Sequence, residues 1–147
     1  MLVYTFRGFP FIAELQGIFG DVFVFGKLRQ DFAAFEQLLQ AEPGYVLGVA
    51  FSKRESRVEP VAINQFNKGK VLADGPETLQ LTLPAASTGI TIAGRPTHTF
   101  CNWTMYRIQN AINEQQLATQ FSFIHIAKHD IALLRTLQDA RLTAKPW

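Results

Sequence analysis

Hydrophobic and polar positions recur along this chain with two periods, one typical of strands and one of helices. Residues 2–6 and 21–25 are short runs rich in aromatic and β-branched residues, which predicts a strand in each. Residues 45–51 are almost continuously apolar, as expected for a strand that is covered on both faces of a parallel sheet. Residues 78–83 alternate polar residues with leucine, which predicts a half-exposed strand with its three leucines directed inward.

Helical periodicity marks the segments between these strands. A stripe of Phe32, Phe35, Leu38 and Leu39 predicts a helix, with Asp31 as its N-cap and an end at the Glu-Pro-Gly sequence that follows. Further short strands are expected at residues 61–63 and 90–92, and a final helix after a cap at Asp130. Since strands and helices are interleaved, we expect an α/β fold: a three-layer α/β/α sandwich with a mostly parallel central sheet.

Residues 100–126 combine a helix, a strand and the residues best suited to chemistry. Cys101, Met105, Ile108 and Ile112 fall at i, i+4, i+7 and i+11, which predicts an amphipathic helix that begins near the cysteine. Residues 121–126 follow as a buried strand that contains His125. The helix start and the strand end can be adjacent in space, so the pair could supply a thiol nucleophile and its base.

Two interpretations of Cys101 stay open at this point. Free N–H groups at a helix start stabilise a thiolate and lower its pKa, which would favour a nucleophile. A lone cysteine is otherwise a small buried hydrophobic residue with a packing role only. A third reading, in which Cys101, His125 and His129 bind a metal ion, relies on a histidine spacing of four residues that suits a helix, whereas His125 lies in a predicted strand.

Length, composition, net charge and cysteine count narrow the class of protein. A chain of 147 residues, 48% hydrophobic, is expected to form a single domain over residues 1–147. The formal charge of +2 gives no reason to expect nucleic acid as a partner, and no apolar run approaches the length of a membrane span. The start of the chain lacks the pattern of a signal peptide and one cysteine cannot form an internal disulfide, so we expect a cytoplasmic protein.

Several segments together resemble the pyroglutamyl peptidase I (pyrrolidone-carboxylate peptidase) family. Residues 101–106, Cys-Asn-Trp-Thr-Met-Tyr, are similar to the family's nucleophile motif, and residues 123–126 to its histidine strand. The interval from Cys101 to His125, 125 − 101 = 24 residues, agrees with the family. Residues 59–64, Glu-Pro-Val-Ala-Ile-Asn, resemble its glutamate motif, and residues 8–11 weakly resemble its N-terminal loop. The likeness covers most of the chain.

The resemblance implies a phosphorylase/hydrolase-like α/β/α fold and a cysteine peptidase that removes an N-terminal 5-oxoproline from peptides. It implies a triad of Cys101 as nucleophile, His125 as base and Glu59 as the group that orients the imidazole, with Phe9 and Phe11 as walls of the substrate pocket. It further implies no cofactor and no metal, a peptide with a blocked N-terminus as substrate, no membrane partner, and a homo-oligomer.

The chain also departs from the family pattern around this predicted site. Pro60 stands where the family has a basic residue, and the segment before Cys101 reads Arg-Pro-Thr-His-Thr-Phe, without the usual Ala-Gly. The alternative function is therefore a catalytically inactive relative that acts as an oligomerising or peptide-binding module.

Overall fold

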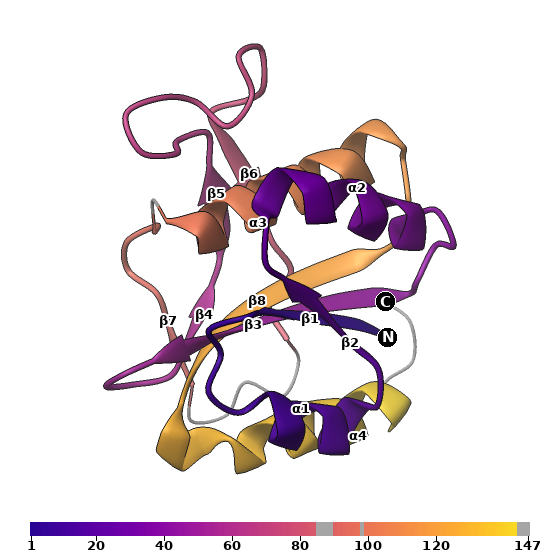
Figure 1. Cartoon of the computed structure of the whole chain (residues 1–147), viewed down its shortest axis with the longest axis vertical. Helices are drawn as coiled ribbons and strands as arrows, with labels where there is room; N and C mark the ends of the chain where they lie inside the picture. Colours follow the sequence, from indigo (N-terminus) through magenta and orange to yellow (C-terminus); the bar gives the residue numbers. More distant parts are fainter. Residues whose placement is uncertain (85–89, 98, 144–147) are drawn as a thin grey trace.

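The structure, a computed structural model, describes residues 1–84, 90–97 and 99–143, with the backbone alone for residues 139–143. Figure 1 shows a sheet with helices on both of its faces. The elements in chain order are β1 (Leu2–Phe6), α1 (Ile12–Phe19), β2 (Val22–Phe25), α2 (Leu28–Leu39), β3 (Tyr45–Ser52), β4 (Arg57–Glu59), β5 (Val61–Ile63), β6 (Thr78–Gln80), β7 (Thr91–Ile92), α3 (Phe100–Glu114), β8 (Gln120–Ala127), the 3-10 helix η1 (Lys128–Asp130) and α4 (Ala132–Thr143).

The central sheet has six strands in the order β2-β1-β3-β8-β4-β7. Its first four strands are parallel, and β4 joins the edge of β8 in the antiparallel direction before β7 pairs parallel to β4. The predicted α/β fold with a mostly parallel sheet is therefore confirmed. The two long central strands, β3 and β8, are almost entirely buried, in agreement with their continuous apolar sequences.

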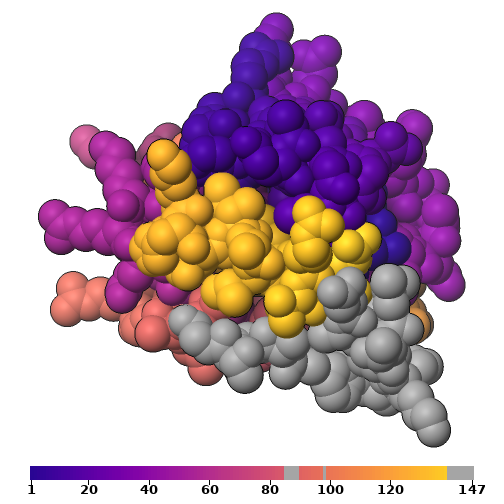
Figure 2. Space-filling view, turned by 90° about the horizontal axis from the view of Figure 1, so that it is seen from below, coloured from indigo at the N-terminus to yellow at the C-terminus, as the bar shows by residue number. Residues whose placement is uncertain are grey.

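Side chains along each strand point alternately to the two faces of the sheet, so the hydrophobic core has one part on each face. In β8, Phe121 and Phe123 belong to the core beneath α2 and α3, whereas Ile124 and Ile126 belong to the core beneath α1 and α4. The opposite face is shown in Figure 2, where the N-terminal segment with α1 lies beside α4. Since successive side chains point to opposite faces, His125 lies on the α2–α3 side with Phe123.

Among the described residues, no helix is both long and apolar enough to cross a membrane.

Two predicted caps were wrong. The helix α2 begins at Leu28, three residues before Asp31, whose carboxylate instead reaches back to accept the N–H groups of Gly26 and Lys27 at 2.7 and 2.8 Å. Those bonds satisfy donors at the entrance to the helix and lower the pKa of Asp31. Asp130 ends the 3-10 helix η1 and accepts a hydrogen bond of 2.7 Å from Ser56, so it ties β8 to the loop before β4.

Two further differences concern elements rather than caps. Helix α1 was not predicted, although Leu15 and Ile18 are buried at helical spacing. Leu83 was expected inward but is exposed, because β6 ends at Gln80 and the alternation does not continue beyond it. Residues 84–99 are rich in glycine, serine, threonine and proline, which predicts a loop with one short strand; of these, residues 85–89 and 98 lie outside the described part of the chain.

Candidate active site

Glu59 and His125 meet at the edge of the central sheet. Strand β4 pairs antiparallel to β8, with Glu59 opposite Phe123 and Arg57 opposite His125. Glu59 and His125 are thus diagonal neighbours on one face. The distance from Glu59 Oε1 to His125 Nδ1 is 2.8 Å, and the two residues are 0% and 6% exposed. The fold therefore places the predicted carboxylate against the predicted imidazole.

The contacts of this pair leave it only partly satisfied. The Nδ1 atom of His125 is close to Oε1 but outside hydrogen-bond geometry, and Glu59 Oε2 has no hydrogen-bond partner among the described residues. The edge of the Phe123 ring packs against the imidazole, with centroids 5.2 Å apart. Burying a carboxylate oxygen without a hydrogen bond costs free energy, which a purely structural role does not explain. The Glu59–His125 pair is therefore suited to receiving a further hydrogen-bond donor.

Arg57 is a third polar member of the site, and it was not predicted from the sequence. Its Nε donates to Glu59 Oε1 at 3.1 Å, and Nη1 lies 3.5 Å from Ser52 Oγ. The side chain is 36% exposed, so it covers the buried carboxylate from the solvent side. A strand through residues 57–59 would have indicated this position, since residues two apart in a strand share a face.

Cys101 lies on the same side of the sheet, in the first turn of α3. It is 4% exposed and packs in the core shared by α2 and α3. Ala50, which lines a cavity together with Cys101, is the strand partner of His125 in the β3–β8 register. No hydrogen bond joins the thiol to the imidazole within the described residues, so the cysteine shares the face of the Glu59–His125 pair without a direct bond to it.

The environment of Cys101 raises its thiol pKa to about 12. Burial is the largest cause; the negative charge of Glu59 adds to it, while a hydrogen bond with Thr99 and the positive charge of Arg57 oppose it. The expectation of a thiol pKa lowered by the helix start is not met, because desolvation outweighs the helix start. The effects of Glu59 and Arg57 also show that the thiol lies within electrostatic reach of both groups.

This raised pKa predicts a pH-dependent stability. The folded thiol has a pKa of about 12 against 9.0 for the free group, so its contribution is complete below pH 9 and is lost as pH rises toward 12. We expect the free energy of unfolding to fall by about 1.4 kcal/mol between pH 8 and pH 10. Urea titrations of the wild type and Cys101→Ala at the two pH values measure it. Equal losses in both proteins would contradict the prediction.

Asn102 fixes the start of α3 against the second, two-stranded sheet of β5 and β6. Its Oδ1 accepts the N–H of Ile63 at 2.9 Å, and its Nδ2 donates to the carbonyls of Ile63 and Gln65 at 2.9 and 2.8 Å. The side chain is completely buried and fully used. Asn102 belongs to the cysteine motif, which predicted no role for it; in the structure it holds the helix start, and so Cys101, at a fixed distance from β5.

A small aromatic cavity opens beside the cysteine. Its volume is about 170 Å³, and it is lined by Phe6, Gly8, Phe9, Ala50, Phe51, Phe100 and Cys101. The two predicted pocket residues thus differ in position. Phe9 lines the cavity, whereas Phe11 packs behind it, with its ring centroid 6.0 Å from that of Phe9 and 5.9 Å from that of Phe51.

The alternative metal site is not assembled in the described part of the chain. His129 lies in η1, beyond the end of β8, and its Nε2 is 3.4 Å from Asp130 Oδ2 in an exposed pair. No group of three or more histidine, cysteine, aspartate or glutamate side chains suited to a metal ion occurs among the residues described.

Comparison with solved structures shows which proteins share this fold. Pyrrolidone carboxyl peptidase from Pyrococcus furiosus superposes with a TM-score of 0.78 at 15% identity, over 96% of this chain and 97% of that one. The corresponding enzyme from Thermococcus litoralis gives 0.71 at 18% identity, over 86% and 75% of the two chains. Pyroglutamyl peptidase I from Bacillus amyloliquefaciens gives 0.70 at 15% identity, over 94% and 90%.

No family model matches the sequence, and no curated protein matches it. The chain therefore has the fold of pyrrolidone carboxyl peptidases, at only 15–18% sequence identity to these three structures.

Proposed function

We propose that this chain is a cysteine hydrolase that removes an N-terminal pyroglutamyl group from peptides, with Cys101, His125 and Glu59 as its triad. The observation that carries the proposal is the buried contact of 2.8 Å between Glu59 and His125, on the face of the sheet that also holds Cys101. Solved pyrrolidone carboxyl peptidases with the same fold support the choice of reaction.

The proposed reaction is hydrolysis through a thioester. The Cys101 sulfur attacks the carbonyl carbon of the pyroglutamyl group while its proton passes to Nε2 of His125, because Nδ1 faces Glu59. The C–N bond then breaks as the imidazolium returns the proton to the leaving amine. Water, deprotonated by His125, hydrolyses the thioester to release pyroglutamate and the free thiol.

Backbone donors for the oxyanion are expected at the start of α3. The first backbone hydrogen bond of this helix runs from Trp103 N to Thr99 O, at 3.1 Å. The amides of Cys101 and Asn102 precede it, at the end of the helix where N–H groups lack intrahelical acceptors. Such donors stabilise the developing negative charge of a tetrahedral intermediate.

A thiol pKa of about 12 determines how the nucleophile would be activated. At neutral pH the resting group is the thiol, so proton transfer to His125 must accompany the attack rather than precede it. Substrate entering the cavity would bring the carbonyl to the sulfur in a water-poor environment. A cavity of about 170 Å³, below the roughly 300–1,000 Å³ that drug-sized ligands occupy, suits one small ring.

The test is hydrolysis of a chromogenic pyroglutamyl amide by the wild type and by Cys101→Ala, purified identically. We expect release of the amine by the wild type and none above background by the variant, since the nucleophile is missing. Prolyl and glutamyl amides serve as substrate controls. Equal rates in the two proteins, or none in either, would remove the enzymatic proposal.

A second candidate function rests on the same cysteine. A thiol that is 4% exposed with a raised pKa also fits a packing role, in a relative that has kept the fold and lost the reaction. Such a protein would bind blocked peptides, or its own copies, without cleaving them. Absence of hydrolysis by a folded wild type, together with binding of a pyroglutamyl peptide in calorimetry, would favour it.

We also propose a substrate, a cellular location and an oligomeric state for this chain. A peptide with a blocked N-terminus as substrate, a cytoplasmic location and a homo-oligomeric state follow from the peptidase assignment. Light scattering on the purified chain would measure the oligomeric state directly.

A further inference from the structure

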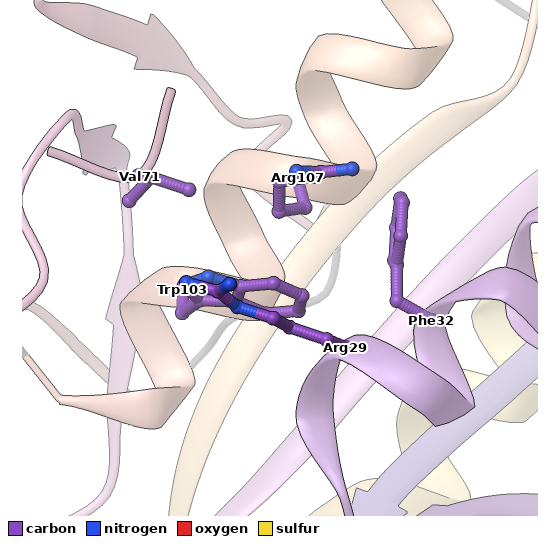
Figure 3. Close-up of a pocket in the computed structure, with 5 residues that line it drawn as sticks. All are labelled: Arg29, Phe32, Val71, Trp103 and Arg107. Atoms are coloured by element: carbon purple, nitrogen blue, oxygen red, sulfur yellow. The ribbon is translucent and has the colours of Figure 1, made fainter. Parts of the chain in front are cut away.

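A second cavity, larger than the one at Cys101, lies between α2 and α3. Its volume is about 300 Å³, and five residues line it: Arg29, Phe32, Val71, Trp103 and Arg107. Figure 3 shows Arg29 and Phe32 on α2 and Trp103 and Arg107 on α3 around one space, with Val71 from the segment between β5 and β6. No residue is shared with the cavity at Cys101, so the two sites are distinct.

The charged side chains that line this cavity are all positive. Arg29 and Arg107 line it, and no carboxylate does. Neither arginine forms an ion pair or donates a side-chain hydrogen bond within the described residues; the ion pairs found there involve Arg57, His125 and His129. Two guanidinium groups without an acidic partner create a field that attracts an anion.

The acidic residues nearest in α2 do not neutralise these arginines. Asp31 is occupied by the backbone N–H groups of Gly26 and Lys27. Glu36 lies one turn beyond Phe32 on the same helix face, but it neither lines the cavity nor pairs with an arginine among the described residues. The positive charge therefore stays uncompensated within the cavity.

Aromatic rings hold one of the arginines in place. The Arg107 guanidinium lies 4.7 Å from the centroid of Phe32 and 5.5 Å from that of Trp103, and the two rings meet edge to face at 5.8 Å. Both rings are nearly buried. A guanidinium over ring faces is attracted to them and still keeps its N–H donors for a ligand. The cavity thus holds a pre-positioned cation, with little more than the edges of the two rings exposed beside it.

We propose that this cavity is a binding site for a small organic anion, in which a carboxylate or phosphate is joined to a flat apolar group. The anionic group would lie between Arg29 and Arg107, which can each donate two parallel hydrogen bonds. The flat group would lie against Trp103 and Phe32. This site is separate from the proposed hydrolase chemistry and does not depend on it.

The test uses the fluorescence of Trp103. The chain has two tryptophans, so Trp147→Phe leaves Trp103 as the only emitter. Phenyl phosphate is the probe, inorganic phosphate tests for an adventitious ion only, and benzyl alcohol tests the ring alone. We expect phenyl phosphate to give a saturable change, with an affinity at least about tenfold higher than that of either control because charge and ring act together.

Substitutions assign the binding to the arginines. Arg29→Gln, at an exposed position, and Arg107→Gln should each weaken phenyl phosphate binding by about tenfold or more, because each removes a charged donor. Arg135→Gln, exposed on α4 at the other face of the sheet, is the matched control and should leave binding unchanged. If Arg107→Gln fails to fold, Arg29→Gln alone decides. No saturable change, equal affinity for inorganic phosphate, or unaltered binding by the folded glutamine variants would overturn the proposal.

Discussion

Removal of the Glu59 side chain in Glu59→Ala is expected to lower the free energy of unfolding by about 3 kcal/mol and to abolish pyroglutamyl hydrolysis. The carboxylate is completely buried, is 2.8 Å from His125 Nδ1 and accepts from Arg57 Nε at 3.1 Å. Loss of one partner from a buried ion pair typically costs 3–5 kcal/mol. We expect the lower end of this range because Arg57, which is partly exposed, can turn toward water. Urea unfolding at neutral pH measures the change.

The matched variant Glu59→Gln separates packing from charge. It keeps the shape of the side chain and a hydrogen-bonding oxygen, so its loss of stability should be clearly smaller than that of Glu59→Ala. Because the Glu59 charge raises the thiol pKa of Cys101, the glutamine variant should react faster with iodoacetamide than the wild type, even as hydrolysis falls. An unchanged alkylation rate together with undiminished hydrolysis would contradict the role assigned to Glu59.

Gly48→Ala is expected to destabilise the protein by about 3 kcal/mol or more. Gly48 lies in β3, opposite Tyr4 of β1 and Phe123 of β8. An added Cβ would be 2.5 Å from Phe123 Cδ2 and 2.6 Å from Tyr4 Cζ. Both rings are fully buried, and Tyr4 is further fixed by a hydrogen bond of 3.0 Å to Thr104. Overpacking a rigid core usually costs 1–3 kcal/mol, and here two rings are displaced at once.

A second glycine provides the control for this substitution. Gly17 lies in α1, and a Cβ at that position would have no atom within 4 Å. Gly17→Ala should therefore stabilise the protein by roughly 0.5–1 kcal/mol, through the higher helix propensity of alanine. Thermal unfolding of both variants gives the comparison. A Gly48→Ala protein as stable as the wild type would show that the rings can move aside.

Local patterns were sufficient for the longest elements. The period of Cys101, Met105, Ile108 and Ile112 predicted α3, and all four side chains are buried in the structure. The apolar run of β3 predicted a strand inside a parallel sheet, and it lies between two parallel neighbours. In both cases the signal extends over several turns or residues, so one local irregularity cannot hide it.

Strand β4 escaped prediction because few residues specify it. Strand β4 spans only Arg57–Glu59 and is separated from β5 by Pro60, which cannot donate to a ladder. The position of β4 depends on pairing with the edge of β8 that β3 does not use, and β8 lies more than sixty residues later in the chain. Without that pairing, neither the meeting of Glu59 with His125 nor the place of Arg57 beside them can be inferred from residue order.

The amino-acid order fixed the α/β class, the burial of the Cys101 face of α3 and the strand that carries His125, because each depends on a periodicity within one element. Three-dimensional packing settled how these elements meet: that Glu59 contacts His125, that Phe9 rather than Phe11 lines the cavity, and that the Cys101 thiol has a raised pKa. The reason is that burial and electrostatic contacts sum over groups that are distant in sequence. For the thiol, desolvation by that packing outweighs the helix start that local sequence had suggested.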